Sequence, residues 1–422
     1  MPRAAHSIER AQEVLSRCLS LACFTEDPPR IRRTFLSPPM RACHQQIETW
    51  MHALGMTTHI DAVGNLHGLY SAADGDASNK LLIGSHLDTV PDAGAYDGIL
   101  GVVLAISLLE SLDGRRLPFA IEVIGFSEEE GVRFGVPFIG SRALVGSIDE
   151  DLLECRDSQG ISVRDAIRAY HLDLNEIPAA ILPQGVLGYL EFHIEQGPVL
   201  EHLQLVLGAV EAIAGQTRME LIFLGAANHA GTTPMNLRRD ALAAAAEWTV
   251  AVEKVAHSTS NLVATVGVLE AKPGADNVIA GECRVTLDVR HASDAVRTRA
   301  VQAILGLADG IANRRGIQVT SATRLMQRAT PMDPFLTAQI EKAILQAGLT
   351  PHRMISGAGH DAMILAEKVS TAMIFLRSPG GISHNPRESV LLEDVAKALE
   401  CGLHLLDRLA ASPEFQKRIH RA

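Results

Sequence analysis

Short apolar runs alternate with amphipathic stretches in the first and last parts of the chain. Apolar runs that predict strands cover residues 81–84, 120–126 and 372–376, and residues 98–112 have the length and composition of a helix. Apolar positions within residues 11–22 recur as on one face of an amphipathic helix. Strands that alternate with helices predict an α/β fold, with a mostly parallel central sheet covered by helices on both faces.

The middle of the chain has a different order of elements. Its pattern predicts strands and helices in the order β-α-β-β-α-β, at residues 216–224, 238–257, 262–269, 282–290, 294–312 and 316–322. This order is that of the split βαβ, or ferredoxin-like, arrangement. We therefore expect a discontinuous catalytic domain, residues 1–211 and 329–422, that is interrupted by an inserted domain at residues 212–328.

Composition narrows the class of protein. The 422 residues are 47% hydrophobic and 21% charged, as in a soluble globular protein with more than one core. The net charge of −11 argues against nucleic acid or an anionic membrane as the main partner. Because the sequence has no signal-peptide pattern, no apolar run of about 18 residues and no paired cysteine spacing, we expect free thiols and a cytoplasmic location.

Side chains that can bind metal ions follow the predicted strands. His86 and Asp88 follow the first strand, three consecutive glutamates at 128–130 follow the second, and His384 follows the last by one loop. In α/β sheets, ligands bind beyond the carboxyl ends of the strands. We therefore expect these side chains to lie close together.

Two further residues extend this set. His193 lies on the polar face of an alternating stretch, and Asp97 lies where a loop turns into the predicted helix at 98–112. Taken singly, such motifs are usually structural: a polar pair, a solvated helix start, a turn. Consecutive glutamates repel one another unless a positive charge lies among them. The combination therefore predicts a site for two metal ions and a hydrolase with an activated water.

The order of motifs resembles the M20 metallopeptidase clan. The motifs are HLDTV, YDG, EEEG, FHIEQGP, NHAGTTPM, DNV, DVRH, SGAGHDA and SHNP. Within the clan, the chain resembles the branch of allantoate amidohydrolases, N-carbamoyl-L-amino acid hydrolases and β-ureidopropionases. HIEQGP together with HAGTTPM is specific to this branch, and the resemblance covers about residues 31–392.

The resemblance implies a role for each matching residue. The implied metal ligands are His86, Asp97, Glu130, His193 and His384, with Asp97 bridging two ions. Glu129 matches the general acid/base, and Asp88 matches the aspartate that orients His86. The implied substrate-binding residues are Gln196, His229, Asn277, Arg290, Gly359 and His360. Among these, His229 would stabilise the developing oxyanion and Arg290 would hold a substrate carboxylate.

The resemblance also implies the chemistry and the assembly. The cofactors would be two divalent ions, zinc or manganese, with cobalt or nickel as substitutes in vitro. We expect hydrolysis of a ureido C–N bond in a small carboxylate, foremost allantoate, which gives ureidoglycine, ammonia and carbon dioxide. N-carbamoyl-L-amino acids and N-carbamoyl-β-alanine are alternative substrates, and an aminoacylase, a peptidase or an inactive metal-binding scaffold are further alternatives. We expect a homodimer formed through the inserted lid domain.

The N-terminal stretch favours allantoate by resemblance alone. It contains the run FLSP at residues 35–38 and the predicted hairpin DAVGNLHG at residues 61–68, both of which resemble allantoate amidohydrolases. No chemical role for residues 36–39 follows from the sequence.

Overall fold

The computed structural model describes residues 2–419, which form two compact units. The first unit contains the described residues up to Glu211, then Met332–Met354, and then the residues from Gly359 onward. The second unit contains Ala212–Pro331 and the short segment Ile355–Ala358. The sequence analysis assigned this short segment to the catalytic domain. It belongs to the second unit because the Ala214 N–H donates to the Ser356 carbonyl over 2.9 Å.

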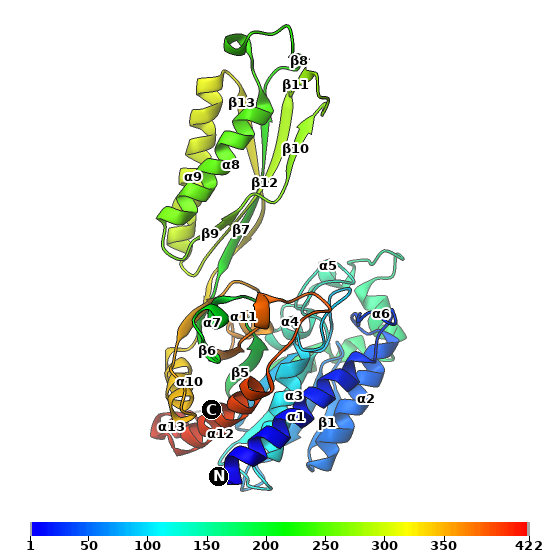
Figure 1. The fold of residues 1–422 in the computed structure, drawn as a ribbon. Helices are drawn as coiled ribbons and strands as arrows, with labels where there is room; N and C mark the ends of the chain where they lie inside the picture. Colours follow the sequence, from blue (N-terminus) through cyan, green and yellow to red (C-terminus); the bar gives the residue numbers. More distant parts are fainter. Residues whose placement is uncertain (1, 420–422) are drawn as a thin grey trace. The chain divides into compact units, whose positions relative to one another are not determined.

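A mixed sheet of the order β1-β2-β4-β3-β5-β16-β6-β14, in which β15 also pairs with β6, forms the centre of the first unit (Figure 1). The strands are β1 (Thr57–Ile60), β2 (Leu66–Tyr70), β3 (Lys80–His86), β4 (Ala120–Phe126), β5 (Val186–Ile194), β6 (Leu207–Ile213), β14 (Thr330–Pro331), β15 (Arg353–Ser356) and β16 (Thr371–Leu376). Only β14 and the last two residues of β6 and of β15 fall in the residues of the second unit. The central strands β4, β3, β5 and β16 are parallel, whereas β1, β2 and β6 pair antiparallel with their neighbours. The predicted α/β class and the parallel central strands are therefore confirmed.

The first unit also contains helices. They are α1 (Pro2–Ala22), α2 (Pro38–Ala53), α3 (Ile99–Glu110), α4 (Ile139–Val145), α5 (Glu150–Leu153), α6 (Val163–Ala169), η1 (Leu174–Ala180), α7 (Val199–His202), α10 (Pro334–Gln346), α11 (Asp361–Leu365), η3 (Pro379–Gly381), α12 (Leu392–Ala411) and α13 (Pro413–Ile419). Of these, α2, α3, α10, α11, α12 and α13 contact the sheet. Eleven of the twelve residues of α3 are buried, which makes it the central helix of the core. Within the described residues, no helix combines the length and the apolar composition that crossing a membrane requires.

Strand β5 separates the core from the polar side of the sheet. Its residues Leu190, Phe192 and Ile194 belong to the large hydrophobic cluster. Because successive side chains of a strand point to opposite faces, Glu191 and His193 point the other way. On that face the Glu191 carboxylate accepts a hydrogen bond of 3.1 Å from the backbone N–H of Ala362, in α11. The strand thus carries an apolar core face and a polar face that faces the candidate site.

The second unit is a five-stranded antiparallel sheet with two long helices side by side on one face (Figure 1). Its elements are β7 (Gly215–Leu224), β8 (Asn228–His229), η2 (Met235–Leu237), α8 (Ala241–Ser258), β9 (Val263–Thr265), β10 (Leu269–Lys272), β11 (Val278–Ile279), β12 (Glu282–His291), α9 (Asp294–Arg315) and β13 (Gln318–Gln327). The sheet order is β10-β12-β7-β13, and β9 also pairs with β12. Alternate residues of β12 are buried with Trp248 of α8 in a core separate from that of the first unit.

Two element boundaries differ from the sequence-based expectation. The strand expected at residues 262–269 is two strands, β9 and β10, with an extra residue between them opposite β12. At this bulge the Thr286 hydroxyl accepts from the Val268 N–H over 3.1 Å. The helix expected from residue 238 begins at Ala241 because the Asp240 carboxylate caps it, accepting from the Ala243 N–H over 3.0 Å.

The close approach of α3 to the sheet gives a testable consequence. A Cβ at Gly101 would lie 2.2 Å from the Phe192 carbonyl oxygen and 2.8 Å from Ser85 Cβ. We expect Gly101→Ala to destabilise the first unit by roughly 1–3 kcal/mol, since neither strand can move away cheaply. Thermal unfolding followed by calorimetry measures this loss. The control is Gly306→Ala in α9, where nothing lies within 4 Å and alanine should stabilise the helix. An equal melting temperature for Gly101→Ala and wild type would contradict the tight packing.

Candidate metal centre

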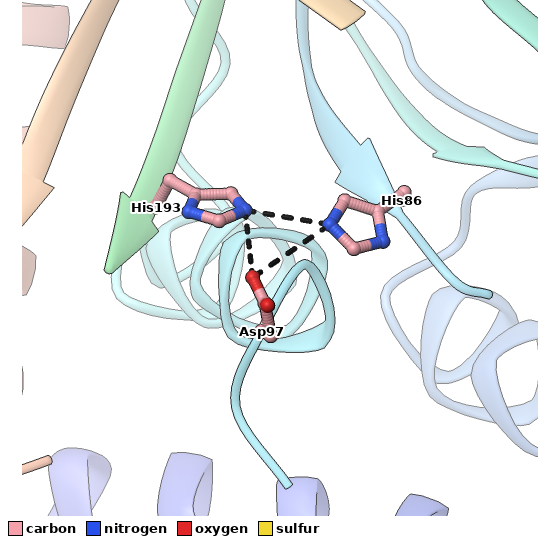
Figure 2. Close-up of side chains that lie close together, drawn as sticks. All are labelled: His86, Asp97 and His193. Carbon is pink, nitrogen blue, oxygen red and sulfur yellow. Dashed lines mark hydrogen bonds and ion pairs between the residues drawn. The ribbon is translucent and has the colours of Figure 1, made fainter. Parts of the chain in front are cut away.

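Three buried side chains converge where the parallel strands end. His86 ends β3, His193 lies at the end of β5, and Asp97 lies in the loop just before α3 (Figure 2). The His193 Nε2 atom lies 3.2 Å from Asp97 Oδ1 and 3.4 Å from His86 Nε2. The His86 Nε2 atom lies 3.9 Å from the same Asp97 oxygen. These three atoms therefore form one compact group of possible metal ligands.

The other oxygen of Asp97 belongs to a second group. The His384 Nε2 atom lies 3.2 Å from Asp97 Oδ2 and 3.5 Å from Glu130 Oε1. Glu130 follows β4, and His384 follows β16 by the loop that contains η3. Each oxygen of Asp97 thus faces a different set of ligands, which is the arrangement that a bridging carboxylate requires.

Gly98 allows Asp97 to reach this position. Its φ of 70° lies in the left-handed region, which glycine adopts without steric cost. A Cβ at this residue would also lie 2.5 Å from the His86 ring. Both the backbone turn and the close approach to His86 therefore require glycine here.

The two buried histidines present the same nitrogen to Asp97. The His86 Nδ1 atom is 3.0 Å from the Asp88 carbonyl oxygen, and the His193 Nδ1 atom is 2.9 Å from the Ile194 carbonyl oxygen. A proton on each Nδ1 satisfies these carbonyls and leaves the Nε2 lone pairs free to coordinate a metal. Burial lowers the pKa of His193 to about 4, so this ring is in the neutral, ligating form at neutral pH.

The spacing of the donor atoms fits metal ions. Ligands bonded at about 2.0–2.1 Å to a tetrahedral zinc ion lie about 3.3 Å apart. The distances between ligand atoms in the two groups lie between 3.2 and 3.9 Å. The donor set is imidazole and carboxylate without thiolate, which suits zinc, manganese and cobalt.

The electrostatics also fit cations. Burial raises the pKa of Glu130 to about 7, and the nearby charges of Asp97 and Asp88 add to this rise while His86 opposes it. Burial likewise raises the pKa of Glu129 well above its usual range. Among residues 2–419, no lysine or arginine pairs with Asp97, Glu129 or Glu130. Divalent ions would supply the missing positive charge.

The Asp88 carboxylate lies beside His86 and also holds a second loop. One of its oxygens lies 3.6 Å from His86 Nδ1, which is 3.0 Å from the Asp88 backbone carbonyl oxygen. The two carboxylate oxygens also accept hydrogen bonds from the Glu129 and Glu130 N–H groups, over 3.0 and 3.1 Å. Asp88 therefore ties the loop after β3 to the loop after β4 and fixes the orientation of both glutamates.

Gln196, expected to contact substrate, lies against the Asp97 carboxylate. Its Nε2 atom is 3.1 Å from Asp97 Oδ1 and 3.0 Å from Oδ2. The same nitrogen lies 3.4 Å from His384 Nε2, while the buried Oε1 has no hydrogen-bond partner among the described residues. The side chain is thus in the candidate centre, with an amide oxygen free to accept from a ligand.

The SGAGHDA segment lies behind His193. The rings of His360 and His193 meet edge to face, with centroids 4.5 Å apart, and His360 is buried. Gly359 contacts Phe138 so closely that a Cβ would lie 2.9 Å from Phe138 Cζ. The next residue, Asp361, accepts a 2.6 Å hydrogen bond from the Ser141 hydroxyl. In the first unit this segment therefore supports the His193 ring.

Glu388 is a site residue that the sequence analysis missed. Its buried Oε1 accepts from the N–H groups of Tyr96 and Asp97, over 2.9 and 3.1 Å. The Ser383 hydroxyl, beside His384, lies 3.1 Å from Asp97 Oδ2 and 3.3 Å from Glu388 Oε2. Glu388 thus joins the Asp97 loop to the His384 loop. Its position four residues after His384 was the only sequence signal for it.

The expected substrate residues of the second unit fall at two separate places. His229 and Asn277 lie together, because β8 pairs with β11 and the Ala230 N–H donates to the Asn277 carbonyl over 2.8 Å. Arg290 lies near the other end of β12, where it binds the Asp288 carboxylate through Nε and Nη2, at 3.0 Å each, and the Gly357 carbonyl through Nη1.

The distance between these two places follows from the strand register. Leu224, which precedes β8, pairs with Glu282, whereas Arg290 pairs with Gln216 eight residues farther along β12. At about 3.4 Å per residue, this separation is about 27 Å. Figure 1 accordingly places β8 and β9, which pairs with Arg290, at opposite ends of the unit. One small molecule cannot contact both His229 and Arg290 of this unit.

Comparison with known proteins places the chain in a family. The family described as peptidase family M20/M25/M40 matches residues 82–408, which include every predicted metal ligand. The chain therefore belongs to peptidase family M20/M25/M40. A probable allantoate deiminase of Oryza sativa subsp. japonica is 39% identical, over 94% of this chain and 88% of the relative.

Two further proteins are similar to this M20 family member over most of its length. An N-carbamoyl-L-amino acid amidohydrolase of Geobacillus stearothermophilus is 38% identical, over 90% of this chain and 93% of the relative. The crystal structure of an amidase of the hydantoinase/carbamoylase family from Burkholderia multivorans has a TM-score of 0.89 at 29% identity, over 96% of this chain and 98% of that one.

The two ligand groups predict the metal content of this M20 family member. We expect the protein, after chelation and dialysis against Zn²⁺, to bind two ions per chain. His384→Ala should bind about one, because His86, Asp97 and His193 stay in place. Elemental analysis of the dialysed proteins measures the content. The control is His257→Ala, a histidine whose side chain is 81% exposed, which should bind as wild type does. Two tightly held ions in His384→Ala would contradict the second group.

Proposed function

We propose that the protein is a metal-dependent amidohydrolase that cleaves a ureido C–N bond of a small carboxylate, foremost allantoate. One observation carries the proposal: the groups His86–Asp97–His193 and Asp97–Glu130–His384 share Asp97, and neither of them needs Glu129, which lies close to His86 and Glu130. Hydrolysis by a metal-activated water in a dinuclear centre uses two such metal sites and a carboxylate that is not a metal ligand and can accept the proton of the water. An inactive scaffold has no use for such a carboxylate.

The residues of the chain divide the work of hydrolysis. His86, Asp97, Glu130, His193 and His384 would hold two divalent ions, zinc or manganese. When bound, these ions would lower the pKa of a water molecule and polarise the scissile carbonyl. Glu129 takes the proton of the attacking water and delivers it to the leaving nitrogen. Burial of Glu129 keeps bulk solvent from exchanging this proton.

The choice of substrate rests on a carboxylate receptor. The Arg290 guanidinium donates through Nε and Nη2 to Asp288 and through Nη1 to Gly357, which leaves one N–H on each Nη atom to bind a substrate carboxylate. It is held next to the SGAGHDA segment through its bond to Gly357. Allantoate and N-carbamoyl-L-amino acids both carry a carboxylate close to a ureido group. The allantoate deiminase relatives favour the first, and the 38% identity to an N-carbamoyl-L-amino acid amidohydrolase makes the second the alternative.

The second unit supports a shared active site. We propose that it is an inserted ferredoxin-like lid domain that also forms a homodimer. If His229, Asn277 and Arg290 all bind substrate, the length of β12 between the two places, about 27 Å from Glu282 to Arg290, requires that they serve two different sites. A dimer in which His229 and Asn277 complete the partner's site satisfies this requirement.

Turnover of a substrate panel tests the function. We expect the highest kcat/KM on allantoate, measured as ammonia release, with lower values on N-carbamoyl-L-amino acids and N-carbamoyl-β-alanine and none on dipeptides. Chelation should abolish the activity, and Zn²⁺ or Mn²⁺ should restore it. Hydrolysis of dipeptides in preference to ureido compounds would overturn the proposal.

Glu129→Gln separates proton transfer from metal binding within the same assay. We expect kcat to fall by about 10²- to 10⁴-fold, because the amide cannot accept the water proton, at unchanged metal content. The matched control is Glu253→Gln, whose side chain is 73% exposed on α8, and which should leave kcat unchanged. Near-normal turnover in Glu129→Gln would refute the role of Glu129.

Mixed dimers test the shared site. His229→Ala and Glu129→Gln should each be inactive alone, since each variant lacks one residue that both active sites of the dimer need. After random exchange of subunits, half of the dimers are mixed and one of their two sites is intact, so about a quarter of wild-type activity should return. Activity that stays at the level of the separate variants after proven exchange would show that each chain builds its own site.

A further inference from the structure

Residues 33–36, here called the strap, lie between helix α1 and the candidate metal centre. They overlap the FLSP run, for which the sequence suggested no role. The side chains of Arg33 and Phe35 in the strap are fully buried. The strap makes hydrogen bonds to both loops that carry the site: the β3 loop, residues 87–89, and the β4 loop, residues 128–130.

The Arg33 guanidinium holds the β3 loop from behind. Its Nε donates to the Leu87 carbonyl over 2.8 Å, and Leu87 lies between His86 and Asp88. Its Nη1 donates to the carbonyls of Leu21 and Phe24, at and beyond the C-terminal end of α1, over 2.9 Å each. Within residues 2–419, no carboxylate forms an ion pair with Arg33.

The backbone of Arg33 adds a second connection to the same loop. Its N–H donates to the Thr89 hydroxyl over 2.9 Å, and the Thr89 N–H donates to the Arg33 carbonyl over 2.9 Å. Ile31, two residues before Arg33, accepts at its carbonyl from the Ala93 N–H over 3.1 Å. Residues 31–33 thus pair with the β3 loop and the residues that follow it, as two strands of a short ladder would.

The other end of the strap holds the β4 loop. The Phe35 N–H donates to the buried carboxylate of Glu128 over 3.2 Å, and Arg133 Nη1 donates to the Phe35 carbonyl over 2.8 Å. Leu36 then turns with a φ of 50° and packs against Gly64, where a Cβ would lie 2.3 Å from Leu36 Cδ2. Because Asp88 already joins the two loops to each other, the strap closes a ring of hydrogen bonds around the back of the site.

A buried, permanently charged guanidinium without a carboxylate partner is costly to fold. An apolar residue such as leucine or methionine could fill the same space in the core without this cost. The guanidinium instead supplies planar donors to three carbonyls on two separate segments, which no other side chain can do.

We propose that Arg33 is a positioning residue that fixes the β3 and β4 loops, and through them His86 and Glu129, in the geometry that the metal centre needs. Arg33 acts through the Leu87 carbonyl and the Thr89 backbone and touches neither metal nor substrate. The metal-binding part of the test rests on the proposed function, whereas the part that concerns loop order does not.

Hydrogen–deuterium exchange of the full-length, chelated protein tests the loop order. Arg33→Met removes the donors while keeping an unbranched side chain. We expect exchange in peptides covering residues 85–92 and 127–133 to become about tenfold faster or more. The acceptors of the Thr89 and Glu129 N–H groups, which are the carbonyl of residue 33 and the Asp88 carboxylate, are no longer held in place once the guanidinium is gone. Thr89→Val, which removes only the hydroxyl acceptor, should give a smaller rise in the same peptides. If Arg33→Met does not fold, Thr89→Val alone decides the test.

Phe415→Leu is the control for a general loss of stability in Arg33→Met. Phe415→Leu enlarges no part of the site, since Phe415 packs in the core against Phe119, at a centroid distance of 5.3 Å. This variant should lower the melting temperature without changing exchange in the two loops. Exchange in the loops that rises no more in Arg33→Met or Thr89→Val than in Phe415→Leu would overturn the proposal, whether or not the protein binds a metal.

Metal affinity supplies the second readout. Titration of the chelated proteins with Zn²⁺ should give an affinity about 10- to 100-fold weaker for Arg33→Met than for wild type and Phe415→Leu. Arg33→Lys should recover only part of this loss, because an ammonium cannot reproduce the planar donors. Arg33→Met that binds Zn²⁺ as tightly as wild type would show that Arg33 is only structural. Wild-type protein that binds no divalent ion would refute the proposed function, and the exchange experiment would still decide the role of the strap.

Discussion

The position of one buried carboxylate, Asp97, determines the rest of the candidate centre. Its two oxygens face different ligand groups, so the distance between the groups is set by the size of a single carboxylate. Burial opposes ionisation of Asp97, but the hydrogen bond with His384 and the neighbouring His193 and His86 together lower its pKa. Asp97 is therefore charged in a place where an isolated carboxylate would not be.

The neighbouring glutamates respond in the opposite direction. Burial and the charges around them raise the pKa values of Glu129 and Glu130, because the histidines that serve Asp97 do not neutralise them fully. In this protein of net charge −11, several acids lie together at one end of the sheet, and within residues 2–419 no lysine or arginine forms an ion pair with Asp97, Glu129 or Glu130. Without cations such carboxyl groups tend to take up protons, as their raised pKa values indicate, whereas bound cations would reverse the rise in both pKa values.

The sequence predicted the elements better than the connections between them. Periodicity located β4 at residues 120–126 and β16 within one residue, because buried parallel strands are continuous apolar runs. The rule that parallel strands end at a common edge predicted that the candidate ligands lie close together. The sequence could not predict that Asp88 binds the β4 loop, 41 residues away, or that Glu388 binds the Asp97 N–H, 291 residues away. No local sequence pattern predicts such contacts, since the residues next to a glutamate in the sequence do not show whether its side chain is buried against a distant loop or exposed to solvent.

These long-range contacts share one physical device. Asp88, Glu388 and Arg33 bind backbone N–H or C=O groups beside the ligands and leave the ligand side chains themselves to the metal centre. A loop held by its backbone keeps its shape when a ligand side chain is removed, because the hydrogen bonds that define it do not involve that side chain. Removal of a ligand should therefore affect metal binding alone, whereas removal of a backbone anchor should affect every ligand on its loop. The geometry of the centre thus depends on Asp88, Glu388 and Arg33, each of which holds a whole loop, whereas each ligand side chain contributes only its own bond to a metal ion.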